Sequence, residues 1–278
     1  MLNLIKMNNV SANLSQAMLE EYNEKGILLL DLPDSILQYE DLYFEEVSIF
    51  LKKMGDIDIA PSSVPDALPE IAEKDRNLIG RLYKVSRRFV SVKRIAVDPW
   101  LAEMSKQLMN APLVSACHFV NIRIDLPGEE KYLLPAHQDF PYIQGSFNAL
   151  TWWIPFLDTT LEMGPPSWIE GSQRLGIQKV KYIDYETTGQ SGGRSFELVG
   201  HDRFSDKDFT HKPVLKGKCV VFHTCLIHRS EPNHTNKARI NLQVRFDDAT
   251  AEESFTRNYP EGLYLGDSFS KHYPQYTL

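Results

Sequence analysis

Two patterns of hydrophobic residues divide the chain near Pro112. Before it, apolar residues recur at helical spacing, as at Leu14, Met18 and Tyr22, which predicts a helix that ends before Gly26. After it, apolar runs are separated by turn residues, which is typical of strands. The predicted helices span residues 13–25, 35–53, 74–94 and 98–109, with a strand at 27–30 and a proline-rich loop at 60–69. The predicted strands of the second part span residues 115–125, 132–140, 147–157, 165–170, 177–183, 212–223 and 238–247.

Helices followed by strands predict an α+β chain, mainly β, in which a β-sandwich or jelly roll is supported by N-terminal helices. We expect one domain over residues 1–278, with helical support over 1–112, a strand core over 113–247 and a tail over 248–278. Residues 184–211 form a long polar segment, and so long a loop in a compact domain favours a lid over a functional site.

Composition narrows the classes of function. The 278 residues carry a formal net charge of −7, which argues against nucleic acid as an obligatory partner, because backbone binding needs a surplus of Lys and Arg. No apolar run is long enough to span a membrane, and polar residues follow the short apolar start at once, unlike a signal peptide. Cys117, Cys219 and Cys225 show no paired spacing, which fits a reducing cytoplasm. The oligomeric state stays open.

Residues 74–94 form a basic stretch. It contains Lys74, Arg76, Arg81, Lys84, Arg87, Arg88, Lys93 and Arg94. These residues are either the solvated face of a helix or a positive rim that attracts an anionic substrate.

His137 and Asp139, in the run Leu-Pro-Ala-His-Gln-Asp-Phe-Pro-Tyr, are the first candidate metal ligands. Two positions apart on an extended strand, their side chains point to one face and can converge on one ion. Two histidines and one carboxylate, with three open positions, are typical of ferrous iron in oxygenases. His228 is the candidate third ligand, because it follows an apolar strand where the chain enters a turn, and barrels present ligands at such ends.

The strand after His228 alternates strictly between polar and apolar residues. Its polar positions are Arg239, Asn241, Gln243 and Arg245, and its apolar positions are Ile240, Leu242, Val244 and Phe246. Period two puts the polar groups on one face, which either meets water or lines an internal cavity. Two arginines in a cavity need anions, and a planar guanidinium suits a carboxylate.

Four motifs in this order resemble the phytanoyl-CoA hydroxylase family. They are His137-Gln-Asp139, Gly164-Pro-Pro-Ser-Trp-Ile-Glu-Gly-Ser-Gln-Arg-Leu-Gly176, Val220-Val-Phe-His-Thr-Cys-Leu-Ile-His228-Arg-Ser230-Glu-Pro-Asn233, and Arg239. The resemblance covers roughly residues 113–247 and implies an iron(II)- and 2-oxoglutarate-dependent oxygenase on a double-stranded β-helix. The chain departs from the family pattern at residues 163–166 and 170–173, which alters a turn and a strand but no metal ligand.

The resemblance also implies roles for individual residues. His137, Asp139 and His228 hold Fe(II), and 2-oxoglutarate and O2 take the open positions. Arg239 and the Ser230 hydroxyl receive the far carboxylate of 2-oxoglutarate. Further expected cosubstrate contacts are Trp153, whose alternative role is core packing, Thr151 and Asn121. The expected substrate contacts are Arg123, Gln138, Phe140, Tyr142, Gln144 and Arg245.

The expected reaction is oxidation of an aliphatic carbon, with release of succinate and CO2. Halogenating relatives have a small residue in place of Asp139, so a carboxylate here favours hydroxylation or a related oxidation. The mixed aromatic and polar site residues favour a small metabolite or natural-product intermediate, and an acyl-CoA stays open. Two rivals stay open. One is a cupin-like metal enzyme without 2-oxoglutarate, against which Arg239 argues, and the other is an inactive ligand-binding module on the same scaffold.

Overall fold

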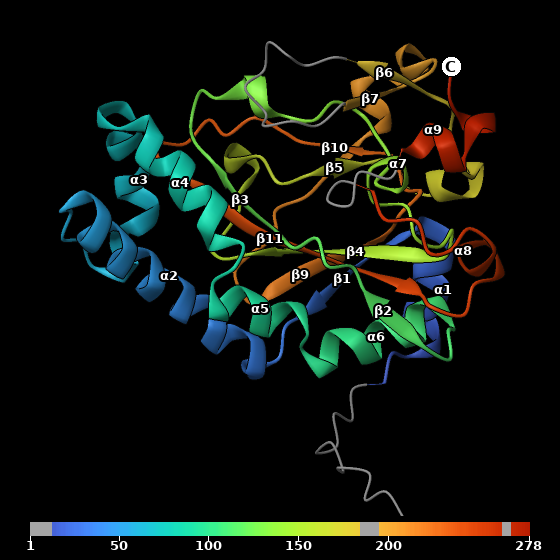
Figure 1. Cartoon of the computed structure of the whole chain (residues 1–278), viewed down its shortest axis with the longest axis horizontal. Helices are drawn as coiled ribbons and strands as arrows, with labels where there is room; N and C mark the ends of the chain where they lie inside the picture. The colour runs from blue at the N-terminus through green and yellow to red at the C-terminus, as the bar shows by residue number, and fades with distance from the viewer. Residues whose placement is uncertain (1–12, 184–194, 263–267) are drawn as a thin grey trace, which may run out of the picture.

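The computed structural model describes residues 13–183, 195–262 and 268–278 (Figure 1). Its α-helices are α1 (Gln16–Lys25), α2 (Asp34–Gly55), α3 (Val64–Lys74), α4 (Arg76–Ser86), α5 (Val90–Ala96), α6 (Pro99–Met109), α7 (Phe140–Ile143), α8 (Glu252–Thr256) and α9 (Phe269–His272). Its strands are β1 (Ile27–Asp31), β2 (Val114–Ala116), β3 (Asn121–Asp125), β4 (Ala149–Pro155), β5 (Ser167–Trp168), β6 (Val180–Ile183), β7 (Ser195–Leu198), β8 (Thr210–His211), β9 (Lys218–His223), β10 (His228–Arg229) and β11 (Arg239–Asp248). Helices therefore precede most of the strands, as the sequence predicts.

The ends of α1 and α6 follow local capping rules. The Ser15 hydroxyl accepts from the backbone N–H of Met18, and Gly26 ends α1 in the left-handed conformation with φ 74°. Asp98 accepts from the backbone N–H of Trp100, with Pro99 in the first turn of α6. Both helices begin and end within a few residues of the predicted limits.

The predicted loop over residues 60–69 is wrong, because α3 begins at Val64. Pro65 sits in the first turn, where its missing N–H costs nothing. Pro69 lies inside the helix and cannot bond to the carbonyl of Pro65. That carbonyl instead accepts from the backbone N–H of Ala238 at 2.8 Å, so a distant segment satisfies the group that Pro69 leaves free.

The predicted helix over residues 74–94 is two helices, α4 and α5, separated at residues 87–89. Asp75 caps α4 through the backbone N–H of Leu78. Of the basic residues in this stretch, only Arg87 is partly buried, with its guanidinium 4.5 Å from the centroid of the Tyr83 ring. The solvated-face interpretation is therefore confirmed for the others, and a role in attracting an anionic substrate stays untested.

The strands form antiparallel sheets. Among the described residues, the largest has the order β1-β9-β4-β11-β2, with β3 also paired to β11. A smaller sheet has the order β10-β5-β8, and β6 pairs with β7. Figure 1 shows these smaller sheets on one side of the large sheet, with α5 and α6 on the other.

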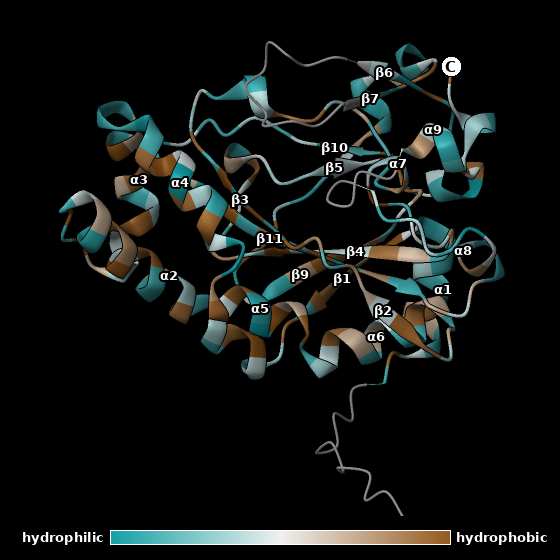
Figure 2. Ribbon diagram, in the orientation of Figure 1, coloured by the Kyte–Doolittle hydropathy of each residue, from teal (hydrophilic) through white to brown (hydrophobic). Residues whose placement is uncertain are grey.

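The two faces of the large sheet differ in chemistry. Apolar side chains of β4, β9 and β11, such as Trp152, Val221 and Leu242, join one core cluster with the helices, and Figure 2 shows apolar residues along the helices of this layer. On the opposite face, Arg239, Asn241 and Arg245 are 3%, 1% and 6% exposed. The alternating strand therefore turns its polar side chains into the protein rather than to water.

Several predicted strands are shorter or broken. Residues 115–125 divide into β2 and β3. Residues 212–223 keep a strand only over β9, which begins after Gly217 turns with φ 84°. Residues 165–170 and 177–183 shrink to β5 and β6. Residues 132–140 form no strand beyond one bridge between His137 and His228. Pro135 lacks the N–H that a ladder needs there.

None of the described helices is both long and apolar enough to cross a membrane. Residues 184–194 of the predicted lid lie outside the described residues, and its remaining part includes the short strands β7 and β8.

Candidate metal centre

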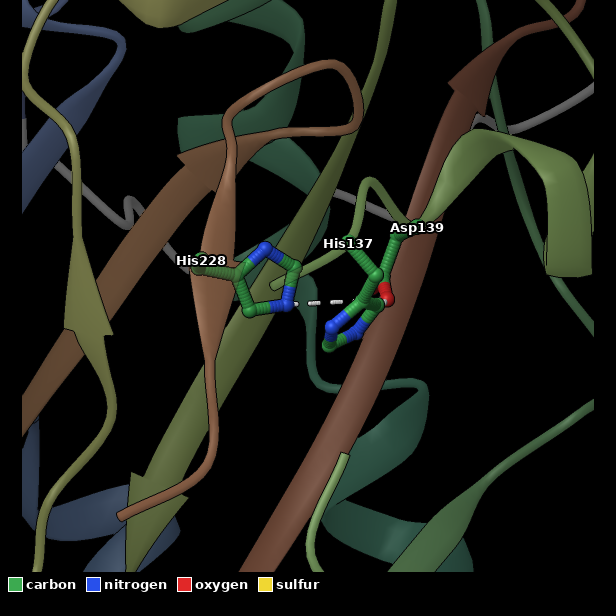
Figure 3. Close-up of side chains that lie close together, drawn as sticks. All are labelled: His137, Asp139 and His228. Atoms are coloured by element: carbon green, nitrogen blue, oxygen red, sulfur yellow. Dashed lines mark ion pairs between the residues drawn. The ribbon is translucent and has the colours of Figure 1, made fainter. Parts of the chain in front are cut away.

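Three buried side chains, His137, Asp139 and His228, converge on one point (Figure 3). Oδ1 of Asp139 lies 3.7 Å from Nε2 of His137 and 3.8 Å from Nε2 of His228. His137, Asp139 and His228 are 4%, 5% and 8% exposed to solvent. They are the only group of potential ligands of this kind that the described part of the chain brings together.

The backbone fixes this convergence by a route that differs from the predicted one. His137 and His228 exchange two backbone hydrogen bonds, at 2.9 and 3.0 Å, so β10 holds both histidines. Asp139 is not on a strand, because its φ of −70° and ψ of −28° are helical and it precedes α7. A turn, and not the alternation of a strand, therefore brings its carboxylate to the histidines.

The hydrogen bonds of the two Nδ1 atoms show which nitrogen of each histidine ring is available as a metal ligand. Nδ1 of His137 lies 2.8 Å from the carbonyl of Pro135, and Nδ1 of His228 lies 3.0 Å from the carbonyl of Leu226. A carbonyl only accepts, so each Nδ1 carries a proton, and the neutral form of each ring presents its lone pair at Nε2. Burial lowers the pKa of His228 to about 4, so that this ring is neutral near pH 7. Two lone pairs and a carboxylate oxygen then face each other without a donor, which calls for a cation.

The second carboxylate oxygen of Asp139, Oδ2, accepts hydrogen bonds from residues that are not candidate metal ligands. Thr151 donates to Oδ2 at 2.6 Å, and Nε of Arg245 donates to the same oxygen at 3.1 Å. Burial alone would raise the pKa of Asp139, but Arg245 and the histidines hold it well below its ordinary value. Oδ1 is thus left as the single ligand atom. Thr151 and Arg245, predicted to contact the cosubstrate and the substrate, both contact the metal-site carboxylate.

Arg239 already has an internal anion. Its Nε and Nη2 donate to Oδ2 of Asp125 at 3.2 and 3.1 Å, while Nη1 donates to the carbonyls of Met163, Gly164 and Glu231. Asp125 also accepts from Nη2 of Arg123 at 2.6 Å. Burial raises the pKa of Asp125, but the two guanidiniums lower it to about 2 overall. The anions that the two strand arginines need are therefore supplied first by Asp125 and Asp139.

The remaining predicted cosubstrate contacts lie on the inner face of the large sheet or near it. Trp153 is 4% exposed and packs in a cluster with Phe222, whose ring lies tilted against the ring of His228. Asn121 accepts from the Tyr83 hydroxyl and donates to Gln243. Ser230 is partly exposed and its backbone N–H donates to Leu134. These positions support packing for Trp153 and leave Ser230 near the end of β10.

Two predicted substrate contacts have structural roles instead. Gln138 is fully buried, and its amide bonds to the backbone of Gly176, Cys225 and Gln178. Phe140 is fully buried in an aromatic cluster with Phe269.

Two others stay close to the centre. Tyr142 packs edge-on against His137 with ring centroids 5.7 Å apart, and its hydroxyl bonds to the backbone of Phe196. Gln144 is buried and lines a small cavity together with Thr151 and Arg245.

Asp125 is the residue of this region that the sequence reasoning missed. It continues the alternation of Asn121 and Arg123 along β3, and its partner across the sheet is Arg239. The alternation was readable from the sequence, but the register that joins Asp125 to Arg239 needed the structure.

Comparison with known proteins adds a sequence match and a shared fold. The profile of the family described as phytanoyl-CoA dioxygenase (PhyH) matches residues 42–241. A 1-deoxypentalenic acid 11-beta-hydroxylase from Streptomyces exfoliatus is 27% identical over 135 residues, which cover 48% of this chain and 47% of that protein. The phytanoyl-CoA dioxygenase domain-containing protein 1 of Bos taurus is 32% identical over 106 residues, covering 37% and 35%. The chain thus matches about half the length of the first relative and about a third of the second.

Solved structures extend the likeness over most of the chain. The epimerase SnoN, in complex with Fe3+, alpha ketoglutarate and nogalamycin RO, is 17% identical with a TM-score of 0.54, covering 84% of this chain and 83% of that one. EctD from S. alaskensis, with 2-oxoglutarate and 5-hydroxyectoine, is 16% identical with a TM-score of 0.55, covering 87% and 79%. At this identity the likeness shows a common fold.

Proposed function

Because the chain belongs to the phytanoyl-CoA dioxygenase (PhyH) family, we propose that it is an Fe(II)- and 2-oxoglutarate-dependent oxygenase that hydroxylates an aliphatic carbon of a small molecule. One observation carries the proposal. Two histidine lone pairs and one carboxylate oxygen converge, all buried, with no donor between them. Such a set suits Fe(II) with three positions left open.

The residues have separate tasks in this reaction. His137, Asp139 and His228 hold the metal, and Thr151 and Arg245 keep Asp139 oriented so that it binds through one oxygen. Bound Fe(II) supplies O2-dependent oxidation coupled to the conversion of 2-oxoglutarate into succinate and CO2. The burial of all three ligands excludes bulk water from the reacting atoms.

Arg239 is the proposed partner of the far carboxylate of 2-oxoglutarate. It is a buried guanidinium on the same inner face as Arg245, and Ser230 is the expected second donor. Because Asp125 already accepts two of its N–H groups, the diacid shares Arg239 with Asp125 or displaces it. Of the five N–H donors of this guanidinium, Asp125 and the backbone carbonyls use those on Nε and Nη1 and one on Nη2, so 2-oxoglutarate takes the remaining Nη2–H or displaces one of these acceptors.

The proposal extends to the fold. The large sheet and the β10-β5-β8 sheet form the two halves of a double-stranded β-helix, and the helical residues before 113 support it as part of one domain. The antiparallel pairing of both sheets and the inward polar face of β11 support this arrangement.

The nature of the substrate follows from the relatives only in outline. One matched relative is named for hydroxylation of 1-deoxypentalenic acid, and structures of the same fold include an epimerase and a carbocyclase of nogalamycin biosynthesis. A small natural-product intermediate is therefore the proposed substrate class, and hydroxylation is the proposed outcome.

The test is anaerobic titration of the purified chain with Fe(II) and 2-oxoglutarate, followed by exposure to O2 and a fractionated metabolite extract. We expect visible absorption from the iron–2-oxoglutarate complex, succinate release that depends on one fraction, and a product about 16 Da heavier, as expected of oxygen insertion. His228→Ala should lose both the absorption and the turnover. Metal binding without any 2-oxoglutarate binding would favour the cupin-like alternative, and binding without turnover in any fraction would favour an inactive module.

A further inference from the structure

One nitrogen of the Arg245 guanidinium has no hydrogen-bond acceptor among the described residues. Nε donates to Asp139 at 3.1 Å, and Nη2 donates to Oε1 of Gln243 at 2.9 Å. Nη1 is buried and has no hydrogen-bond partner among the described residues, and the whole residue is 6% exposed. A buried cationic donor without an acceptor is unfavourable, so this nitrogen points to a ligand that completes it.

Arg245 and Arg239 lie on one face of β11 but are well separated along the strand. They are six residues apart on β11, which separates their Cα atoms by about 20 Å at the rise of an extended strand. Nε of Arg245 contacts Asp139 directly, whereas Arg239 contacts Asp125 and the carbonyls near residues 163 and 231. A ligand on Arg245 therefore does not compete with 2-oxoglutarate for Arg239.

Arg245 also lines a cavity of about 80 Å³. Thr151, Gln144 and Thr224 line the same cavity, so it adjoins the residues that hold Asp139. A water molecule occupies about 30 Å³ of the liquid, so the cavity has room for a carboxylate-sized group.

The charges of the inner face leave a positive surplus. Within the described ranges, the guanidiniums of Arg123, Arg239 and Arg245 form ion pairs with two carboxylates, those of Asp125 and Asp139. The charge of Fe(II) and that of the 2-oxoglutarate dianion cancel, so loading the site does not remove this surplus. An unbalanced charge in a buried site is unfavourable, and an anionic substrate balances it.

Two further acids line the cavity, but each has a partner of its own. Asp247 accepts from the Ser115 hydroxyl, and burial raises its pKa, which favours the uncharged form. Glu261 pairs with His118. Neither contacts the guanidinium of Arg245 through a hydrogen bond in the described part of the chain.

We propose that Nη1 of Arg245 binds a carboxylate of the substrate, so that the substrate is a small carboxylic acid. The inference rests on the proposed function, because it assigns the substrate subsite of the same centre. Arg245 then joins the substrate anion to the metal-ligand carboxylate, and it sets which end of the substrate approaches the metal. Neutral analogues of the same shape should bind poorly because they leave the guanidinium unbalanced.

The experiment uses the full chain with Fe(II) and 2-oxoglutarate under anaerobic conditions. Benzoate and cyclohexanecarboxylate are the probes, and their primary amides are the uncharged matches. Binding is followed by calorimetry and by changes in the visible absorption of the iron–2-oxoglutarate complex. We expect the acids to bind at least about tenfold more tightly than the amides, and Arg245→Gln to remove that preference.

Two variants separate direct contact from general charge. Arg245→Lys keeps the cation and should retain part of the preference. Arg123→Gln removes another inner-face charge without touching Nη1, so it should retain most of it. If Arg245→Gln and Arg123→Gln lose the preference for acids equally, the preference arises from the overall positive charge of the inner face and not from a contact with Nη1, and the proposal is wrong.

Other outcomes are equally decisive. The proposed subsite is wrong if wild-type protein binds acids and amides equally well, or binds neither acid at millimolar concentration, while it still binds iron and 2-oxoglutarate. If iron or 2-oxoglutarate fails to bind to wild-type protein, the proposed function itself is wrong and the subsite falls with it.

Discussion

Nε and Nη2 of Arg239 both donate to one oxygen of Asp125, at 3.2 and 3.1 Å, in a pair that is almost fully buried. Arg123 holds the other oxygen of the same carboxylate. A carboxylate of the protein thus keeps the proposed 2-oxoglutarate anchor in place before any ligand arrives. This arrangement orients the guanidinium in advance, and it also gives the diacid a competitor.

Replacing Arg239 separates the cosubstrate from the metal. Arg239→Ala should weaken 2-oxoglutarate binding by about 100-fold or more, because a charge-assisted anchor is lost. The affinity for Fe(II) should stay nearly unchanged, since Arg239 contacts none of the three metal-site side chains through a hydrogen bond in the described residues. Calorimetry with each ligand measures both effects. Tight 2-oxoglutarate binding in the variant would contradict the assignment.

Removing the charge of Asp125 should make stability depend on the cosubstrate. Asp125→Asn leaves Arg123 and Arg239 buried without a full anion, which should lower the free energy of unfolding by about 3 kcal/mol. Added 2-oxoglutarate should then stabilise the variant more than the wild type, because the diacid replaces the lost charge. Chemical denaturation with and without 2-oxoglutarate measures this. Glu70→Gln breaks an exposed pair with Lys74 and is the control, for which little change is expected. Equal stabilisation of variant and wild type would contradict the prediction.

Thr151 offers a test of how Asp139 is oriented. Thr151→Val keeps the shape of the side chain and removes the 2.6 Å hydrogen bond to Oδ2. Loss of such an outer contact should weaken Fe(II) binding by about 10- to 100-fold. Thr159→Val is the matched control, since Thr159 is also fully buried but donates to the carbonyl of Leu157. If both variants bind Fe(II) like the wild type, Thr151 has no part in orienting the ligand.

The sequence predicts the metal triad and the inward polar face well, because both depend on local pattern and on residue chemistry. His137, Asp139 and His228 do converge, and Arg239 and Arg245 are buried on one face. The backbone conformation that brings Asp139 to the histidines is harder to predict. Asp139 reaches the histidines from a helical turn, which Pro135 and Pro141 favour over a continued strand.

Partners across the sheet could not be read from the sequence. Asp125 meets Arg239 only because β3 and β11 pair in one register, and a shift of one residue would turn either side chain away. The same holds for Thr151, which stands opposite Arg245 across β4 and β11. Gln138 is an expected substrate contact, and the sequence could not show that its amide donates to the backbone carbonyl of Cys225, which is distant along the chain.

Helix α2 carries a buried acid whose charge the described residues do not balance through a hydrogen bond. Glu40 lies on the core side of α2, fully buried, and neither of its carboxylate oxygens has a hydrogen-bond partner among the described residues. Burial raises the pKa of Glu40 to about 8, against the smaller opposing effect of Lys216. The side chain is therefore largely protonated in the folded protein near neutral pH.

Glu40→Gln should stabilise the protein at pH 8 and not at pH 4. Below the ordinary pKa of a glutamate both the folded and the unfolded chain hold this proton, so the residue has no effect on the pH dependence. As the pH rises from about 4.5 to 8, the unfolded chain releases the proton while the folded chain retains it, and stability falls. Gln lacks this proton, so the variant should gain about 4 kcal/mol in the free energy of unfolding at pH 8 relative to pH 4, from about 1.4 kcal/mol per unit of pKa shift. Glu45→Gln, on the exposed side of the same helix, is the control and should show no such difference. Urea denaturation at both pH values measures the change, and parallel curves for wild type and Glu40→Gln would show that Glu40 ionises normally in the folded chain.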